Sequence, residues 1–371
     1  MFTDDYNLFV ALFLNKLTKS KKYLVVKNNL AIENERLTCC SEKLRTYISP
    51  YTSPIVSELR KNGFQLLGTT CMDEFACGCY STNTFYKKPL SPIGNFSIGG
   101  SSGGSGAAVA RLKEYSVLGL GSTTGGSIAL PALFNSVFGF VPSKNKISRV
   151  GLVDYSNTLD RIGFLFLKQK ISEEVHSLLY PLQTKTPSTF AFFYPPSLDE
   201  VLKNLFLEFL NKNFPKAEFV NLEEELKLFE KIYPKIAYPE LYSNLKRFEK
   251  NHFRNCVEGE EKMKIVITQR IEKGKEFILN GEYPQAINLY RTLQHTLLKK
   301  LEGIGYLFLP VLSTIPQKDV PFSEQLSAFS NLAPFSTLYV PLSNLVSIQV
   351  SALTKDLEGS ELLFFKKWMK K

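Results

Sequence analysis

The stretch Gly99 to Pro131, GGSSGGSGAAVARLKEYSVLGLGSTTGGSIALP, holds two glycine–serine clusters joined by one apolar segment. The clusters are GGSSGGSG at 99–106 and GSTTGGS at 121–127. Glycine permits positive φ and close approach of the backbone, and each cluster ends where a helix is expected to begin. Turns of this kind leave backbone N–H groups directed at one point, which suits a bound anion or a developing oxyanion. Two serine-bearing turns that return to one point favour nucleophilic chemistry on a carbonyl over simple binding.

Three other interpretations of this stretch are weaker. A phosphate-binding loop would need a lysine after the glycines, as in GxxxxGK[ST], and neither cluster has one. The windows 99–103 and 100–104 both match the GxSxG nucleophile elbow by letter. An elbow serine needs a histidine base, but none of the histidines, His176, His252 and His295, lies in a segment that suggests catalysis. A pair of glycine-rich connectors with solvated serines is the remaining alternative.

The composition is that of an ordinary globular protein with a basic balance. In 371 residues, 44% are hydrophobic and 22% charged, so the chain can bury a sizeable core. The net charge of +10 favours an acidic partner such as nucleic acid, although lysines interrupted by glutamates also form plain solvated surfaces. The cysteines form no CxxC pair and have no histidine at ligand spacing, so we expect no metal site. They also do not form the framework of a small secreted domain, so we expect a reducing compartment. No apolar run approaches the roughly 20 residues of a membrane span, so we expect no membrane segment.

Hydrophobic periodicity predicts an alternation of helices and strands. Residues 5–20 predict a helix, and Tyr23 to Val26 indicates a strand that delivers Lys27 at its end. The other expected elements are helices at 54–62, 172–179 and 361–371 (with Trp368 on its apolar face) and strands at 64–67 and 190–193. Residues 198–212 and 222–302 are expected to be mostly helical, and 307–310 and 338–350 have β-like composition.

Lys27 is the candidate base for a serine nucleophile. A serine hydroxyl is inert at neutral pH without a base. Because histidines are scarce, the candidate is a neutral lysine that acts through a second serine. A lysine at the end of an apolar strand lies at the rim of a core, where burial disfavours its charge and lowers its pKa.

Four stretches resemble the amidase signature enzymes, in the order that the family has them. They are VVKNN at 25–29, GGSSGGS at 99–105, GSTTGGSIALPA at 121–132 and GFVPSKNKISRVGLV at 139–153. Two further stretches, MDEFACG at 72–78 and RVGLVDYSNTLDRIG at 149–163, resemble the glutaminase subunits of tRNA-dependent amidotransferases within that family. The resemblance implies an α/β fold with a large mixed central β-sheet covered by helices on both faces. It implies one domain over 1–371, with the catalytic motifs in 1–195 and a helical and C-terminal half, 196–371, that completes the sheet.

The resemblance also implies a catalytic triad of the Ser–cis-Ser–Lys type. Ser127 resembles the nucleophile that forms the acyl-enzyme, and Lys27 resembles the base. Ser101 resembles the serine that follows a cis peptide and passes the proton on. Its neighbour Ser102 is the second choice for that position and a candidate for substrate binding. The backbone amides of Thr124, Gly125 and Gly126, together with that of Ser127 itself, would form the oxyanion hole.

The activity implied by the resemblance is hydrolysis of glutamine through a γ-glutamyl ester, with ammonia released to a partner in a complex. The resemblance implies that this complex contains the B subunit of an amidotransferase together with a small C- or F-type accessory subunit. The complex would bind tRNA(Gln) and convert Glu-tRNA(Gln) to Gln-tRNA(Gln). This chain would need no cofactor or metal, whereas the partner would use ATP and Mg²⁺. A mitochondrial location is expected if the source is a eukaryote. The cytoplasm is the alternative, since the N-terminus is not a good transit peptide.

Several positions depart from the family's pattern. Thr123 and Ala129 stand where the family has an acidic residue and an arginine. The family's glutamine-recognising arginine matches Arg291 by proximity but Gln294 by alignment, so Arg291 is the candidate for substrate binding. Asn331 is the polar residue nearest to the position of the family's acidic partner. These departures leave two alternatives open: a stand-alone amidase that acts on another small amide, or a structural subunit that is catalytically impaired.

The acidic and thiol groups between the motifs are expected to be structural. Asp73 and Glu74 are predicted to be solvated loop charges or caps rather than acid–base groups. Cys77 and Cys79 are predicted to be small core residues, because nothing nearby would lower their pKa. The predicted chemistry therefore depends on the lysine and the serines.

Overall fold

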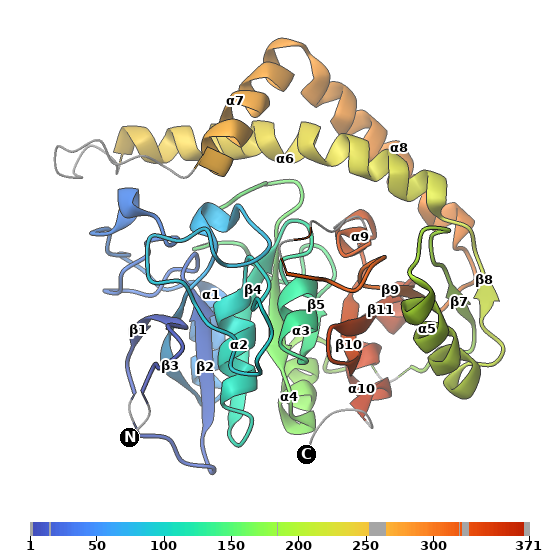
Figure 1. The fold of residues 1–371 in the computed structure, drawn as a ribbon, viewed down its shortest axis with the longest axis horizontal. Coiled ribbons are helices and arrows are strands. Elements are labelled where there is room, and N and C mark those ends of the chain that lie inside the picture. The colour runs from blue at the N-terminus through green and yellow to red at the C-terminus, as the bar shows by residue number, and fades with distance from the viewer. Residues whose placement is uncertain are drawn as a thin grey trace.

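A computed structural model of the chain describes residues 3–14, 16–183, 185–251, 265–318, 320 and 326–366. Within these residues, an 11-stranded sheet has the strand order β1-β3-β2-β4-β6-β5-β10-β11-β9-β7-β8 (Figure 1). The strand β2 is parallel to both of its neighbours, and so is β7, while the other neighbouring pairs are antiparallel. The strands are β1 Phe9–Leu12, β2 Lys22–Lys27, β3 Phe64–Thr70, β4 Ser116–Thr123, β5 Phe138–Val141, β6 Arg161–Phe166, β7 Phe190–Phe192, β8 Glu218–Phe219, β9 Tyr306–Pro310, β10 Thr337–Ser343 and β11 Val346–Ala352.

Helices cover both faces of this sheet (Figure 1). The side chains of a strand alternate between its two faces. In β2, Leu24 and Val26 therefore pack in the core that includes α1 and α4, while Tyr23 and Val25 pack in the core that includes α2 and α3. The mixed sheet with helices on both faces is as predicted. The helices are α1 Pro54–Lys61, α2 Gly103–Arg111, α3 Ala129–Phe134, α4 Gln169–Leu179, α5 Glu200–Asn213, α6 Glu223–Asn251, α7 Ile265–Leu279, α8 Glu282–Lys300, α9 Phe329–Leu332 and α10 Ser360–Phe364.

The sheet joins the two halves of the chain. β5 from the first half pairs with β10 from the second, and β7 lies beside β9. A third core packs α6, α7 and α8 against residues of the first half, such as Phe75 and Tyr155, and against Leu307 and Leu309 of β9. The long helix α6 consequently crosses above the loops at one end of the sheet, with α7 and α8 folded back over it (Figure 1).

Two predicted elements differ from the structure. Residues 5–20 are not a helix: β1 pairs antiparallel with β3, with Phe9 opposite Thr70. The free edge of β3 offers hydrogen bonds to a short apolar segment, and this pairing outweighs helical spacing. The β-like composition at 338–350 is confirmed, since these residues lie in the hairpin of β10 and β11. The last helix ends at Phe364, and Trp368 lies outside the described residues.

Candidate active site

Lys27 is the last residue of β2, and its side chain is fully buried. Because β2 runs parallel to β4, the two strands end at the same edge of the sheet, where the second glycine–serine cluster begins. Lys27 Nζ lies 2.7 Å from Ser101 Oγ, 3.0 Å from Ser122 Oγ and 3.2 Å from the Ser122 carbonyl oxygen. The amine is therefore surrounded by oxygen atoms in a site without solvent.

Burial lowers the pKa of Lys27 from its ordinary value of 10.5 to about 7, against the opposing effect of the Asp73 and Asp160 carboxylates. Burial also raises the pKa of Asp73 to about 6 and that of Asp160 to about 7, so Asp160 is only partly ionised near neutral pH. A neutral amine has two N–H groups and one lone pair. If the N–H groups donate to the two Ser122 oxygens, the lone pair faces the Ser101 hydroxyl and can accept its proton.

Ser101 lies between Lys27 and Ser127. The peptide bond Gly100–Ser101 is cis. Ser101 Oγ lies 3.0 Å from Ser127 Oγ, so Lys27 Nζ, Ser101 Oγ and Ser127 Oγ form a continuous hydrogen-bonded row. The structure thus brings the three residues of the predicted triad together from β2, from the loop before α2 and from the loop after β4. Their catalytic roles stay a prediction.

Thr123 and Asn331, two positions that depart from the family's pattern, form hydrogen bonds to the loop before Ser127. Thr123 Oγ1 donates to the Gly125 carbonyl oxygen at 2.7 Å, and Asn331 Nδ2 donates to the same oxygen at 3.1 Å. Arg161 Nε in turn donates to Asn331 Oδ1 at 3.2 Å. The C=O and N–H of a trans peptide point in opposite directions, so fixing this carbonyl directs the following N–H away from the Thr123 hydroxyl.

A buried carboxylate fixes the other side of this loop. Thr124 Oγ1 donates to Asp160 Oδ1 at 2.6 Å, and Asp160 Oδ2 accepts from the amides of Tyr155 at 2.7 Å and Ser156 at 3.0 Å. In the part of the chain that the structure describes, the amides of residues 125–127 donate to no protein acceptor. Preorganised, unpaired N–H groups beside a hydroxyl are what an oxyanion requires.

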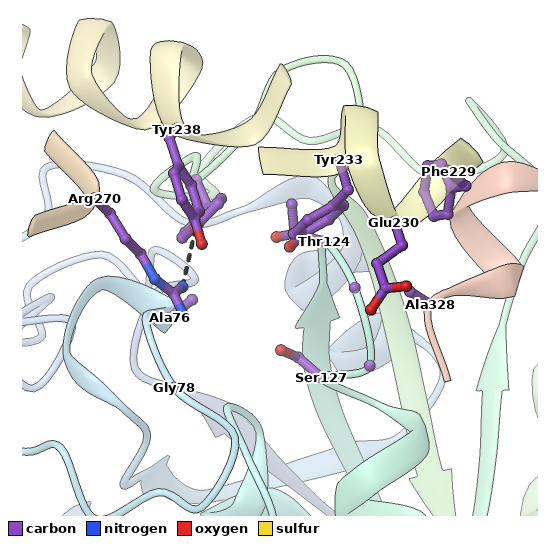
Figure 2. Close-up of a pocket in the computed structure, with 13 residues that line it drawn as sticks. Ala76, Gly78, Thr124, Ser127, Phe229, Glu230, Tyr233, Tyr238, Arg270 and Ala328 are labelled. Atoms are coloured by element: carbon purple, nitrogen blue, oxygen red, sulfur yellow. Dashed lines mark hydrogen bonds between the residues drawn. The ribbon is translucent and has the colours of Figure 1, made fainter. Parts of the chain in front are cut away.

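The serine loop faces a cavity of about 180 Å³. Figure 2 shows Ser127 at its floor, with its hydroxyl directed into the open space below α6. The charged residues in the described wall are Glu230 from α6 and Arg270 from α7, on opposite sides of Ser127 in this view (Figure 2). The wall consists of Ala76, Gly78, Thr124, Gly125, Gly126, Ser127, Tyr155, Phe229, Glu230, Tyr233, Tyr238, Arg270 and Ala328.

Arg270 is the guanidinium in this cavity. Its Nη1 donates to Tyr155 Oη at 3.0 Å, which Figure 2 draws as a dashed line. Its Cζ lies 5.4 Å from the ring centroid of Tyr238 and 5.9 Å from that of Tyr155, so two rings fix its plane. Arg291, the predicted substrate-binding residue, instead lies exposed on α8 and is not part of the wall. No sequence motif flanks Arg270, so the pattern of letters gave no signal for it.

Ser102 does not face the cavity either. Its Oγ donates to the Ser122 carbonyl at 3.0 Å and accepts from the Ser122 amide at 3.4 Å, so it ties the two clusters together. Ser122 is a further site residue that was not predicted. It contacts Lys27 and accepts a hydrogen bond from Asn29 Nδ2 at 2.9 Å. Its place in GSTTGGS, at the end of a strand beside β2, was the available signal.

Asp73 and Glu74 are not solvated, contrary to the prediction: their exposed fractions are 1% and 3%. Asp73 accepts from the Ser81 amide at 2.9 Å, and Glu74 accepts from Ser41 Oγ at 2.6 Å. A Cβ added to Gly100 would lie 2.2 Å from the Asp73 carboxylate, so only glycine fits beside it. Both acids therefore pack the loops around the serine row.

The other candidate groups lie away from the chemistry. Cys77 is buried as predicted, and burial raises the pKa of its thiol to about 12. His176 is buried in α4, His295 is exposed on α8, and His252 lies outside the described residues. Among the described residues, no group of three or more histidine, cysteine, aspartate or glutamate side chains could hold a metal ion. None of the described helices combines the length and apolar character needed to span a bilayer.

A family comparison agrees with this arrangement. The amidase family model matches residues 23–175, which contain the lysine and both serine clusters. The chain has the predicted amidase-signature fold. Among solved structures, the A subunit of glutamyl-tRNA(Gln) amidotransferase from Thermotoga maritima superposes with a TM-score of 0.75 at 24% identity, covering 96% of this chain and 85% of that one. Urea amidolyase from K. lactis gives 0.81 at 20% identity, covering 96% of this chain and 24% of that one.

Several curated relatives are named as A subunits of glutamyl-tRNA(Gln) amidotransferase. The protein from Campylobacter lari is 40% identical over 172 residues, which is 46% of this chain and 37% of that protein. The protein from Borreliella afzelii is 32% identical over 265 residues, 61% of this chain and 53% of that protein. A mitochondrial relative from Fusarium vanettenii is 42% identical over 160 residues, 42% of this chain and 30% of that protein. The matched regions thus span between 30% and 53% of these relatives' length.

Proposed function

We propose that this protein is a glutaminase that hydrolyses glutamine to glutamate and ammonia through a γ-glutamyl ester on Ser127. The observation that carries the proposal is the unbroken row from Lys27 Nζ through Ser101 Oγ to Ser127 Oγ, with the unpaired amides of residues 125–127 beside it. A base, a proton carrier, a nucleophile and an oxyanion site are the parts that acyl transfer requires.

The proposed reaction has two steps. In the first, Ser127 Oγ attacks the amide carbon while its proton passes to Ser101 and the Ser101 proton passes to neutral Lys27. The oxyanion lies at the amides of residues 125–127 until the C–N bond breaks, and the leaving nitrogen takes a proton back through Ser101. In the second step, water attacks the ester carbon, its proton follows the same row, and Ser127 recovers its hydroxyl as glutamate leaves.

Arg270 is the group proposed to hold the substrate's α-carboxylate. Its planar guanidinium suits a carboxylate, and the Tyr155 and Tyr238 rings keep it in place. A carboxylate bound there lies across the cavity from Ser127, so recognition and bond breaking occur at opposite ends of one substrate (Figure 2). This role replaces the one predicted for Arg291.

The partners are also part of the proposal. Relatives named as A subunits of an amidotransferase support a complex with a B subunit, joined by a small C- or F-type accessory subunit. The ammonia would be consumed by the B subunit, which would use ATP and Mg²⁺ to convert Glu-tRNA(Gln) to Gln-tRNA(Gln). The net charge of +10 suits a complex that binds tRNA. Mitochondrial relatives support a mitochondrial location.

The test is glutamate release from L-glutamine by the full chain, alone and with its B subunit. We expect turnover that Ser127→Ala reduces about a thousand-fold. Ser57→Ala on α1, outside the cavity wall, is the matched control and should keep full activity. Activity that survives in Ser127→Ala would reject the nucleophile. Wild-type protein that is inactive in the complex would favour the impaired structural subunit, and broad amide turnover without partners would favour a stand-alone amidase.

A further inference from the structure

Glu230 is a charged wall residue that the proposed glutamine chemistry does not use. It comes from α6, it is exposed, and its carboxylate points from α6 toward the part of the cavity near Ser127 and Ala328 (Figure 2). Within the described residues it makes no hydrogen bond or ion pair. A lone carboxylate at the mouth of a cavity is available to a cation that enters with a ligand.

The position of Glu230 relative to Arg270 places Glu230 beside the leaving-group end of the proposed substrate. Ser127 lies between the two charges in Figure 2. If the carboxylate of a γ-glutamyl group binds Arg270 and its carbonyl carbon lies at Ser127, the bond to the leaving nitrogen continues away from Arg270. The leaving group then occupies the Glu230 side of the cavity. This step depends on the proposed function.

We propose that Glu230 recognises a cationic leaving group, so that the site also hydrolyses γ-glutamyl amides of diamines. Ser127 Oγ would form its ester bond to the side-chain carbonyl carbon of the γ-glutamyl group, the C–N bond would break, and the released nitrogen would take its proton through Ser101. The free diamine leaves, and water then hydrolyses the ester to glutamate. The second, protonated amino group takes no part in these steps and lies near the Glu230 carboxylate.

The wall beside Glu230 suits the rest of such a leaving group. Phe229 and Ala328 are apolar, and both line the cavity next to Glu230 (Figure 2). Methylene groups between the scissile nitrogen and the terminal ammonium would contact these two side chains. The same carboxylate would repel an anionic leaving group, so we expect the site to prefer cationic over anionic leaving groups.

The experiment compares γ-glutamyl-diaminobutane with γ-glutamyl-butylamine, which is uncharged at the far end. For the wild-type full chain we expect kcat/KM to favour the cationic substrate about five-fold, the size of an exposed ion pair, and less at high salt. Glu230→Gln should bring the ratio to about one, and Glu230→Lys should invert it. Glu224→Gln, an exposed glutamate on the same helix outside the wall, is the matched control and should keep the wild-type ratio.

A ratio near one in wild type, or a ratio that Glu230→Gln leaves unchanged, would overturn the inference. Glutamine turnover is measured in the same preparations, so loss of the proposed function is seen separately. Calorimetric binding of the two compounds to Ser127→Ala tests the same preference without turnover. Equal affinities there would also overturn it, whereas a preference abolished by adding Glu230→Gln would support it.

Discussion

Replacing Lys27 by methionine is expected to make the fold more stable while it abolishes catalysis. The unfolded chain has a lysine with the ordinary pKa of 10.5, whereas burial lowers the folded value to about 7. At pH 6 that difference costs the folded state about 5 kcal/mol. The substitution also removes the three hydrogen bonds from Nζ, each worth about 1 kcal/mol. The net expectation at pH 6 is a gain of about 2 kcal/mol in the free energy of unfolding.

Urea unfolding followed by circular dichroism between pH 6 and 10 measures this gain. Between pH 7 and 10.5 the unfolded lysine binds more protons than the folded one, so wild-type stability should rise with pH relative to the variant. The advantage of Lys27→Met should therefore shrink across that range. Lys21→Met, at an exposed position, serves as the control. A variant that is less stable than wild type at pH 6, or whose advantage does not shrink, would refute the reasoning.

Four further predictions concern rate, recognition and stability. The kcat/KM for glutamine should rise with pH and level off above about 7, because only neutral Lys27 accepts a proton, and a flat profile from pH 5 to 8 would contradict this role. Thr123→Val removes the hydroxyl that holds the Gly125 carbonyl, so kcat should fall about ten-fold with little change in Tm, whereas an unchanged kcat would mean that the loop needs no such support. Arg270→Lys keeps the charge but loses the planar fork, so KM should rise about ten-fold while kcat is largely kept; a loss in kcat alone would argue against carboxylate binding. Burial raises the pKa of Glu361 from 4.5 to about 8, so stability should fall as pH rises between those values, and Glu361→Gln should remove that fall in a denaturant series.

The floor of the site could be predicted from the sequence because its parts are local. Lys27 ends an apolar strand, and the serines lie in clusters whose glycines mark tight turns beside helix starts. Parallel strands end at one edge, so short motifs far apart in the chain meet there without any knowledge of side-chain packing. Thr123 shows the limit of this approach, because its departure from the family's pattern gave no hint that its hydroxyl would orient the loop.

The part of the cavity wall that α6 and α7 contribute, which we call the roof of the site, could not be predicted in the same way. Arg270 and Glu230 lie on helices where charged residues are common on solvated faces, so neither stands out by spacing. Which of them faces the cavity depends on how α6 and α7 pack over the sheet, a long-range property. The same limit explains β1, whose residues follow the edge of β3, and Asp73, whose burial is imposed by the loops around it.

The division between floor and roof has an evolutionary consequence. The proposed catalytic row belongs to segments before residue 130, whereas both charges proposed to recognise the substrate belong to α6 and α7. A lineage can therefore diversify the compounds it consumes by altering one helical module, while the ancestral reactive core is inherited intact. Transplanting residues 223–300 between family members would be the laboratory counterpart of that process, with selectivity expected to travel with the graft and chemistry to remain with the host.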